Sequence, residues 1–252
     1  MNWDPDRYEQ FSEVRLRPGL DLLERIGDID PRTVVDLGCG TGTLTAILAR
    51  RWPKAQVTGL DSSEQMLERT PTDAPNVTWE RGDIASWQVN HPVGLIFSNA
   101  ALHWLDDHAR LFNRLVRALG AGGVLAVQMP DNWTEPTHRI PAAVLDEGDY
   151  PNEARRALLR DRVAREEDYR RWLGPDADCD IWSTTYNQEL KGENPVLEWV
   201  RGSVLAPVSA ALDDPTPFLA ECARRYKLAY PPQSDGATVL PFRRLFIVAR
   251  RR

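Results

Sequence analysis

The chain has few cysteines and no long apolar run. Its three cysteines, Cys39, Cys179 and Cys222, are scattered, odd in number and include no closely spaced pair, which indicates neither a disulfide framework nor a zinc site. The first residues are polar and acidic where a signal peptide is apolar, and no later run approaches membrane-spanning length. We therefore expect a cytoplasmic protein with no membrane partner and no bound metal.

Basic residues are outnumbered by acidic ones. The chain has 31 lysines and arginines against 37 aspartates and glutamates, a net charge of -6. Proteins that neutralise phosphate backbones normally need a basic face, so we expect no nucleic-acid partner. Hydrophobic residues at 42% and charged residues at 27% are typical of a globular protein, and a chain of 252 residues can form one large α/β domain. The oligomeric state stays open.

Short apolar runs alternate with helical patterns through the first half of the chain. Such alternation predicts a parallel sheet with crossover helices. The predicted strands are residues 33–37, 56–60, 76–80, 93–98 and 123–128, and the predicted helices are residues 44–51, 63–69 and 106–119. We therefore expect an α/β fold, a Rossmann-like doubly wound sheet that is mostly parallel.

The alternation ends after residue 128. Proline-rich and aromatic segments follow, then a charged helical stretch at 152–173 and a helical pattern at 195–206. We expect one domain, 1–252, with seven strands, a C-terminal antiparallel edge hairpin and a helical cap. Its predicted parts are an N-terminal helical lid (1–30), a ligand-binding core (31–130), the cap (131–177 and 193–235) and edge strands (178–190 and 238–250).

Three closely spaced glycines follow the first predicted strand. Gly38, Gly40 and Gly42 come directly after a β-branched run that ends near Asp36, and a predicted helix follows them. Glycines allow a tight turn and a close approach of the backbone to a ligand. A dinucleotide site prefers the last two glycines three residues apart; here they are two apart, and Asp36 would repel a pyrophosphate. The loop, with Thr41, favours S-adenosylmethionine, whose charges are cationic; the alternative is a tight turn that binds nothing.

Further candidates follow the second and third strands. Asp61 ends the second strand about 20 residues beyond the glycines, where a carboxylate commonly binds ribose hydroxyls, with Ser62 and Met66 beside it. Asp83, next to Ile84, is placed to accept a hydrogen bond from the adenine amino group. Met66 as core filler and Asp83 as a turn residue are the alternatives.

The tip of the fourth strand carries another polar and aromatic group. Ligands of open α/β sheets bind at the carboxyl ends of the strands, so Asn99, Ala100, His103 and Trp104 are expected at the junction of cofactor and acceptor. The alternative for Trp104 is simple packing against the next helix.

These features together resemble a known family. The loop at 36–42, with Asp61 and Asp83, is similar to the cofactor site of class I S-adenosylmethionine-dependent methyltransferases, and the segments 11–18, 129–133, 135–138, 180–186 and 244–249 resemble the trans-aconitate 2-methyltransferase family. The resemblance implies methyl transfer to a carboxylate of trans-aconitate, which gives a monomethyl ester and S-adenosylhomocysteine. His103, where glutamine is common, and the charged stretch 152–173 depart from the pattern and leave substrate preference open.

Acceptor binding is expected to depend on cations and aromatic rings. A carboxylate is already ionised at neutral pH, so positioning is sufficient and we assign no catalytic triad or metal. Arginine pairs well with carboxylates. The substrate-binding candidates are Tyr8, Arg15 and Arg17 near the N-terminus, then His103, Trp133, His138, Trp182, Tyr186 and Arg201. Solvated helix charges and core packing are the alternatives for these residues.

Three other functions remain open from the sequence. A methyltransferase for another small acid or for a hydroxyl acceptor shares the same cofactor half; a hydroxyl acceptor needs a general base, for which His103 or His138 is available. A non-catalytic module that binds S-adenosylmethionine is an alternative of a different class. A dinucleotide oxidoreductase is disfavoured by the glycine spacing and by Asp36.

Overall fold

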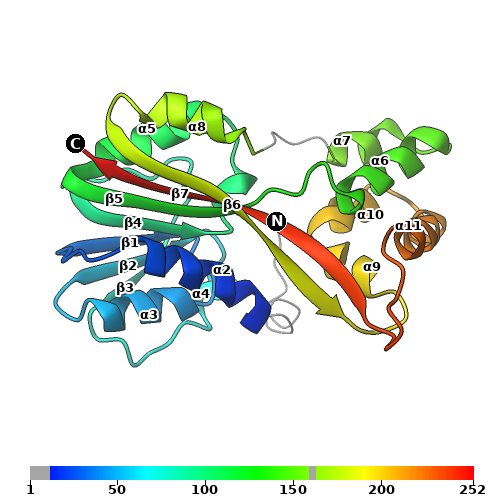
Figure 1. Ribbon diagram of the computed structural model, residues 1–252, viewed down its shortest axis with the longest axis horizontal. Helices are drawn as coiled ribbons and strands as arrows, with labels where there is room; N and C mark the ends of the chain where they lie inside the picture. Colours follow the sequence, from blue (N-terminus) through cyan, green and yellow to red (C-terminus); the bar gives the residue numbers. More distant parts are fainter. Residues whose placement is uncertain (1–11, 159–162) are drawn as a thin grey trace. The chain divides into compact units, whose positions relative to one another are not determined.

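A single seven-stranded sheet organises the computed structural model, which describes residues 12–158 and 163–252 (Figure 1). The strand order is β3-β2-β1-β4-β5-β7-β6; β1 to β5 are parallel, and β7 is antiparallel to β5. The predicted fold class is therefore confirmed. The strands are β1 (Thr33–Leu37), β2 (Gln56–Asp61), β3 (Val77–Arg81), β4 (Val93–Asn99), β5 (Leu119–Pro130), β6 (Ala177–Leu190) and β7 (Thr238–Arg251).

The described residues form two compact units. The sheet unit comprises residues 12–130, 163–184 and 244–252, and the helical unit comprises residues 131–158 and 185–243. The helices of the sheet unit are α2 (Ser12–Arg25), α3 (Thr43–Arg51), α4 (Glu64–Leu67), η1 (Leu102–Trp104), α5 (His108–Ala118) and α8 (Glu166–Leu173). Those of the helical unit are α6 (Pro136–Glu147), α7 (Asn152–Ala157), α9 (Pro195–Val200), the π-helical turn η2 (Arg201–Leu205), α10 (Ala206–Ala210) and α11 (Thr216–Ala229).

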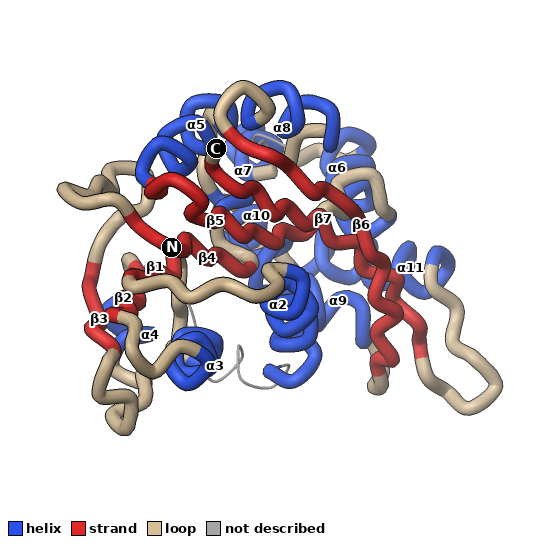
Figure 2. Tube along the Cα trace, turned by 60° about the vertical axis from the view of Figure 1, so that its left-hand side comes forward, coloured by secondary structure: helices blue, strands red, loops and turns tan. Residues whose placement is uncertain are grey.

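Both faces of the parallel sheet are covered inside the sheet unit. In Figures 1 and 2, α2 and α3 lie on one side of the strands, and α5 and α8 lie on the other. The central strands are accordingly apolar on both faces: Leu37, Leu95 and Phe97 are fully buried. The sheet is thus fixed as a rigid platform whose carboxyl ends carry the candidate site.

Two local predictions were wrong. The stretch 152–173 is not one helix: α7 ends at Ala157 in the helical unit, and α8 begins at Glu166 in the sheet unit. Arg165 before α8 is extended, and the three acidic residues 166–168 open that helix, where they complement the positive end of its dipole. Strand β5 begins at Leu119 instead of residue 123, because pairing with β4 continues across a register shift near Val93.

Helix α8 is held to α5 by aromatic packing. The ring of Tyr169 lies 4.7 Å from that of Phe112, and its hydroxyl is 2.5 Å from Nδ1 of His108. Tyr169 is fully buried. Although α8 is highly charged, these contacts therefore bury part of it against α5.

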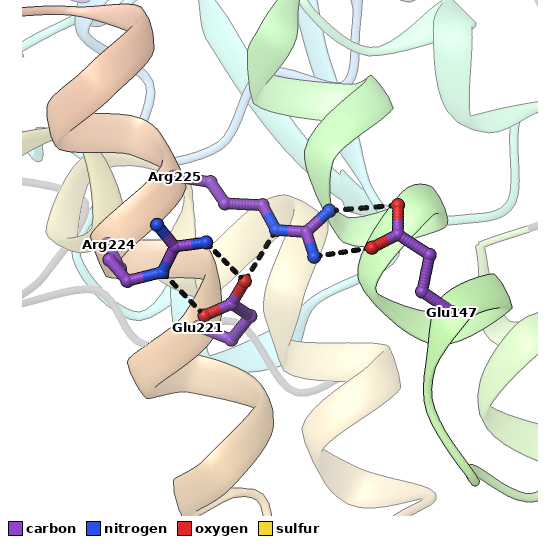
Figure 3. Close-up of polar contacts among 4 residues, drawn as sticks. All are labelled: Glu147, Glu221, Arg224 and Arg225. Carbon is purple, nitrogen blue, oxygen red and sulfur yellow. Dashed lines mark hydrogen bonds and ion pairs between the residues drawn. The ribbon is translucent and has the colours of Figure 1, made fainter.

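A chain of ion pairs joins α6 to α11 in the helical unit. Arg225 donates to Glu147 at 2.6 Å and to Glu221 at 2.7 Å, and Glu221 also accepts from Arg224 at 2.8 Å (Figure 3). The two arginines lower the pKa of Glu221 to about 2, through hydrogen bonds and charge. The contacts tie two helices that share an apolar interface.

No helix among the described residues is long and apolar enough to cross a membrane. Within the same residues, no group of three histidine, cysteine or acidic side chains is placed to hold a metal ion.

Candidate active site

The glycine loop between β1 and α3 adopts backbone conformations that require glycine. Gly38, Gly40 and Gly42 have φ angles of +77°, +56° and +78°, in the left-handed region that side chains disfavour. A Cβ on Gly38 would lie 2.2 Å from Cβ of Ala101, and one on Gly42 would lie 2.4 Å from the Trp79 ring. The space beside Gly40 is open instead, since a Cβ there meets no atom within 4 Å.

The carboxylate of Asp61 holds this loop at the end of β2. Its Oδ2 accepts a hydrogen bond from the Gly40 amide at 2.9 Å, and its Oδ1 accepts one from the Ser63 amide at 2.9 Å. The amides of Gly38 and Cys39 both donate to the carbonyl of Leu60, at 2.8 and 3.0 Å. The loop and the predicted ribose-binding carboxylate therefore form one hydrogen-bonded structure.

Asp36, at the end of β1 before the loop, is buried and is not part of the cavity lining described below. The side chain is 2% exposed, and the Thr45 hydroxyl donates to its Oδ2 at 2.6 Å. Burial raises the pKa of Asp36 to about 7, and the charge of Asp61 adds to the rise while the Thr45 hydrogen bond opposes it. The Asp36 carboxyl group, with its raised pKa, thus joins β1 to α3 through Thr45.

A cavity of about 300 Å³ opens at the carboxyl ends of β1, β2 and β4. Ten of the residues predicted to bind the cofactor line it: Gly38, Gly40, Asp61, Ser62, Met66, Asp83, Ile84, Asn99, Ala100 and Trp104. Asp36 and Thr41 are not in this lining. Gly82, Ala101 and Leu105 line it too and were missed, because none carries a side chain whose chemistry indicates a ligand.

The segment after β3 is fixed by turn hydrogen bonds. Asp83 Oδ1 accepts from the Ala85 amide at 2.8 Å, as a turn aspartate does. Arg114 donates to the carbonyls of Ile84 and Trp87, at 2.8 and 2.6 Å. Both sequence interpretations of Asp83 therefore fit: it makes a turn and it lines the cavity. Met66 does the same, being 4% exposed and also part of the lining.

The tip of β4 turns sharply at a residue that is not glycine. Ala100 has a φ of +55°, and its amide donates to the carbonyl of Gln128 on β5 at 2.9 Å. This turn presents Asn99 to the cavity. Asn99 Oδ1 is buried and has no hydrogen-bond partner among the described residues. An unsatisfied buried acceptor of this kind is costly unless a ligand donates to it.

The predicted acceptor residues fall in both units. In the sheet unit, Arg17 is exposed on α2, His103 packs 4.7 Å from Trp104, and Trp182 stacks on Phe246 at 4.8 Å with 9° between the rings. Tyr8 and the side chain of Arg15 lie outside the described residues.

The remaining acceptor candidates belong to the helical unit. The rings of Trp133 and His138 lie 4.8 Å apart, and Tyr186 is 6% exposed. Arg201 is paired with Glu198, three residues earlier, at 2.5 Å. The structure therefore brings Trp133 and His138 together, while Arg201 already has an anionic neighbour on its own helical segment.

Residues 34–123 match the family model described as a methyltransferase domain. Among solved structures, the fold is similar to the YcgJ protein from Bacillus subtilis, with a TM-score of 0.62 at 14% identity over 94% of this chain and 99% of that one. It is also similar to an S-adenosylmethionine-dependent methyltransferase from Mesorhizobium loti, with a TM-score of 0.53 at 24% identity over 92% of this chain and 96% of that one.

Sequence similarity to curated proteins is much higher. The trans-aconitate 2-methyltransferase of Methylobacterium nodulans is 45% identical, over 99% of this chain and 98% of that protein. The trans-aconitate 2-methyltransferase of an Azoarcus species is 43% identical, over 99% of both chains. The similarity covers the sheet unit and the helical unit alike, so this chain belongs to the trans-aconitate 2-methyltransferase family.

Proposed function

We propose that the chain is an enzyme that transfers the methyl group of S-adenosylmethionine to a carboxylate of trans-aconitate, with the monomethyl ester and S-adenosylhomocysteine as products. Family membership at 45% identity over nearly the full length supports the substrate. The observation that supports cofactor binding is the cavity, which Asp61 and Asn99 both line beside the glycine loop.

The polar groups of this cavity suit a cationic nucleoside. Its lining includes the carboxylates of Asp61 and Asp83, and the lining residues as described include no lysine or arginine. Ribose hydroxyls and an ammonium group are hydrogen-bond donors, so they match carboxylate and amide oxygens. A pyrophosphate would instead be repelled. The lining thus favours S-adenosylmethionine over a dinucleotide.

The proposed residues divide the binding work. Asp61 would bind the ribose, Asp83 with Ile84 and Met66 the adenine, and Asn99 the amino-acid end. When bound, the cofactor supplies a methyl group made electrophilic by its sulfonium. The chain contributes orientation and exclusion of water, because an ionised carboxylate needs no base to become nucleophilic. We assign no catalytic acid or base for this acceptor.

For acceptor binding we retain the residues that were predicted from the sequence. We propose that they provide charge and shape for a small polycarboxylate: Tyr8, Arg15, Arg17, His103, Trp133, His138, Trp182, Tyr186 and Arg201. Arg17 is the first of them to test, since it is exposed on α2. A cytoplasmic location fits the three cysteines, all of which are free thiols.

A panel of acceptors tests the proposal. Purified enzyme is incubated with S-adenosylmethionine and, separately, with trans-aconitate, cis-aconitate, citrate and a hydroxylated analogue that lacks carboxylates. We expect release of S-adenosylhomocysteine with trans-aconitate above all. Turnover of only the hydroxyl compound, at a rate that falls as His103 becomes protonated, would contradict the proposal. Cofactor binding without turnover of any compound would favour a non-catalytic module.

A further inference from the structure

One polar side chain on the central strands has no explained role. Gln128 lies near the carboxyl end of β5 and is completely buried. Neither its Nε2 nor its Oε1 has a hydrogen-bond partner among the described residues. A buried amide with both groups unsatisfied destabilises the fold, whereas a leucine or methionine of similar size would not. Such a residue is explained most simply by a ligand that satisfies it.

The strand register pairs Gln128 with one residue of the cofactor cavity and places it near a cationic residue of β7. It pairs with Asn99 on β4 and with Phe246 on β7, while Arg244 on β7 pairs with Pro130, two residues farther along β5. Paired residues, and residues two apart on a strand, project from the same face of a sheet. Asn99, Gln128 and Arg244 therefore share one face at the same end of neighbouring strands.

This face also carries a residue predicted to bind the acceptor. Trp182 stacks on Phe246, the partner of Gln128, with 4.8 Å between the ring centroids. The guanidinium of Arg25, at the end of α2, lies 5.3 Å from the Trp182 ring. Helix α2 packs against β5, and a Cβ on Gly19 of α2 would lie 3.3 Å from Cγ of Asn99. Arg25 is already paired with Asp180 at 2.6 Å, so the face combines an amide, the Arg244 guanidinium, an aromatic ring and this ion pair.

Gln128 is next to the cofactor cavity without belonging to its lining. Its carbonyl accepts from Ala100, which lines the cavity, whereas its side chain is absent from that lining as described. The cavity lining presents oxygen acceptors, which suit a cation, whereas the Gln128 amide and the Arg244 guanidinium carry N–H groups of the kind that suit an anion.

We propose that Gln128 is an acceptor-binding residue, whose Nε2 donates a hydrogen bond to a carboxylate of the acid while Arg244 contributes positive charge on the same face. The inference rests on the proposed function, because it assumes a carboxylic acid as acceptor. It adds a position on β5 to the acceptor residues.

Replacement of the amide by an apolar chain of similar length tests the proposal. We expect Gln128→Met to raise KM for trans-aconitate at least tenfold, to leave the Kd for S-adenosylmethionine within twofold, and to leave the melting temperature unchanged or higher. If the Gln128 amide had only a structural role, Gln128→Met would instead lower the melting temperature and leave KM unchanged. The matched control is Gln188→Met, at another nearly buried glutamine on β6, which we expect to leave KM unchanged.

Assays of the wild-type enzyme distinguish failure of the proposed function from failure of the role proposed for Gln128. If it methylates no carboxylic acid, the proposed function fails and the role of Gln128 fails with it. If it methylates trans-aconitate and Gln128→Met retains the wild-type KM, the inference about Gln128 alone is overturned. If Gln128→Met does not fold, Gln128→Asn provides the same comparison. Asparagine keeps the amide group, but its shorter side chain moves the N–H donor away from the acceptor. An unchanged KM in this variant would again overturn the inference.

Discussion

The amide of Gly40 donates a hydrogen bond of 2.9 Å to the carboxylate of Asp61, across 21 residues of sequence. This bond joins the glycine loop after β1 to the end of β2, so the two parts of the sequence that indicate a cofactor are one structural unit. Disturbing either residue should therefore affect both the loop and the ligand.

Removal of the Asp61 carboxylate should weaken cofactor binding. In Asp61→Ala the Gly40 and Ser63 amides lose their acceptor, and a bound ribose loses its own. Leaving buried partners unsatisfied costs about 1–3 kcal/mol, which corresponds to roughly a 5- to 150-fold rise in Kd for S-adenosylmethionine. Isothermal calorimetry measures it directly. Asp149→Ala, at an exposed aspartate of the helical unit, is the control; equal binding by both variants would remove Asp61 from the site.

Two glycines with the same φ angle allow the energetic cost of backbone strain to be measured separately from the cost of a steric clash. Gly27 and Gly38 both have a φ of +77°, but a Cβ meets nothing within 4 Å at Gly27 and lies 2.2 Å from Ala101 at Gly38. Gly27→Ala should cost only the left-handed penalty, about 1–2 kcal/mol. Gly38→Ala should lower the free energy of unfolding further and also abolish cofactor binding. Urea unfolding tests this; equal losses in the two variants would show that the collision is relieved without cost.

Asp36 should make the protein less stable as pH rises through the acidic range. Its pKa in the fold is about 7 against an ordinary value of 3.8, so between these values the folded state binds the proton more tightly than the unfolded state. The contribution of Asp36 to stability is then most favourable below pH about 4 and falls toward pH 7, by about 4 kcal/mol at about 1.4 kcal/mol per pKa unit. Asp36→Asn should flatten this slope while Thr45 keeps its acceptor. A slope unaltered in Asp36→Asn would contradict the assignment.

The ion pairs between α6 and α11 predict the opposite dependence at lower pH. The pKa of Glu221 is about 2, below its ordinary value of 4.5, so its contribution is present above pH 4.5 and is lost as pH falls toward 2. Arg225→Met, which removes contacts to both Glu147 and Glu221, should lower the melting temperature at pH 7 more than at pH 3. Arg224→Met removes the contact to Glu221 alone and should have the smaller effect. A pH-independent difference would mean that the ion pairs contribute little.

Much of the fold follows from local patterns in the sequence. Strand β1 occupies the predicted residues 33–37, and the helix predicted at 106–119 is α5, with Leu111 and Leu115 buried as its spacing indicated. These predictions hold because burial on both faces produces continuous apolar strands and an amphipathic stripe on each covering helix. The glycine loop could also be predicted from the sequence, because its φ angles are accessible to few residues other than glycine.

Other features depend on contacts that the sequence does not display. The burial of Asp36 and its hydrogen bond from Thr45 could not be read from the sequence, because both depend on the packing of α3 against β1. Gln128 was not noticed, because a single polar residue in an apolar strand acquires meaning only from its register with Asn99 and its lack of described partners. The pairing of Arg201 with Glu198 was likewise not predicted, because it depends on side-chain conformation.

Methylation of trans-aconitate itself is the most direct measurement. The wild-type protein, S-adenosylmethionine with a labelled methyl group, and trans-aconitate are incubated together, and the acid is recovered and examined by mass spectrometry. We expect one labelled methyl ester per acid and an equal amount of S-adenosylhomocysteine. Recovery of trans-aconitate without label, under conditions where calorimetry shows the cofactor to be bound, would contradict the proposed activity.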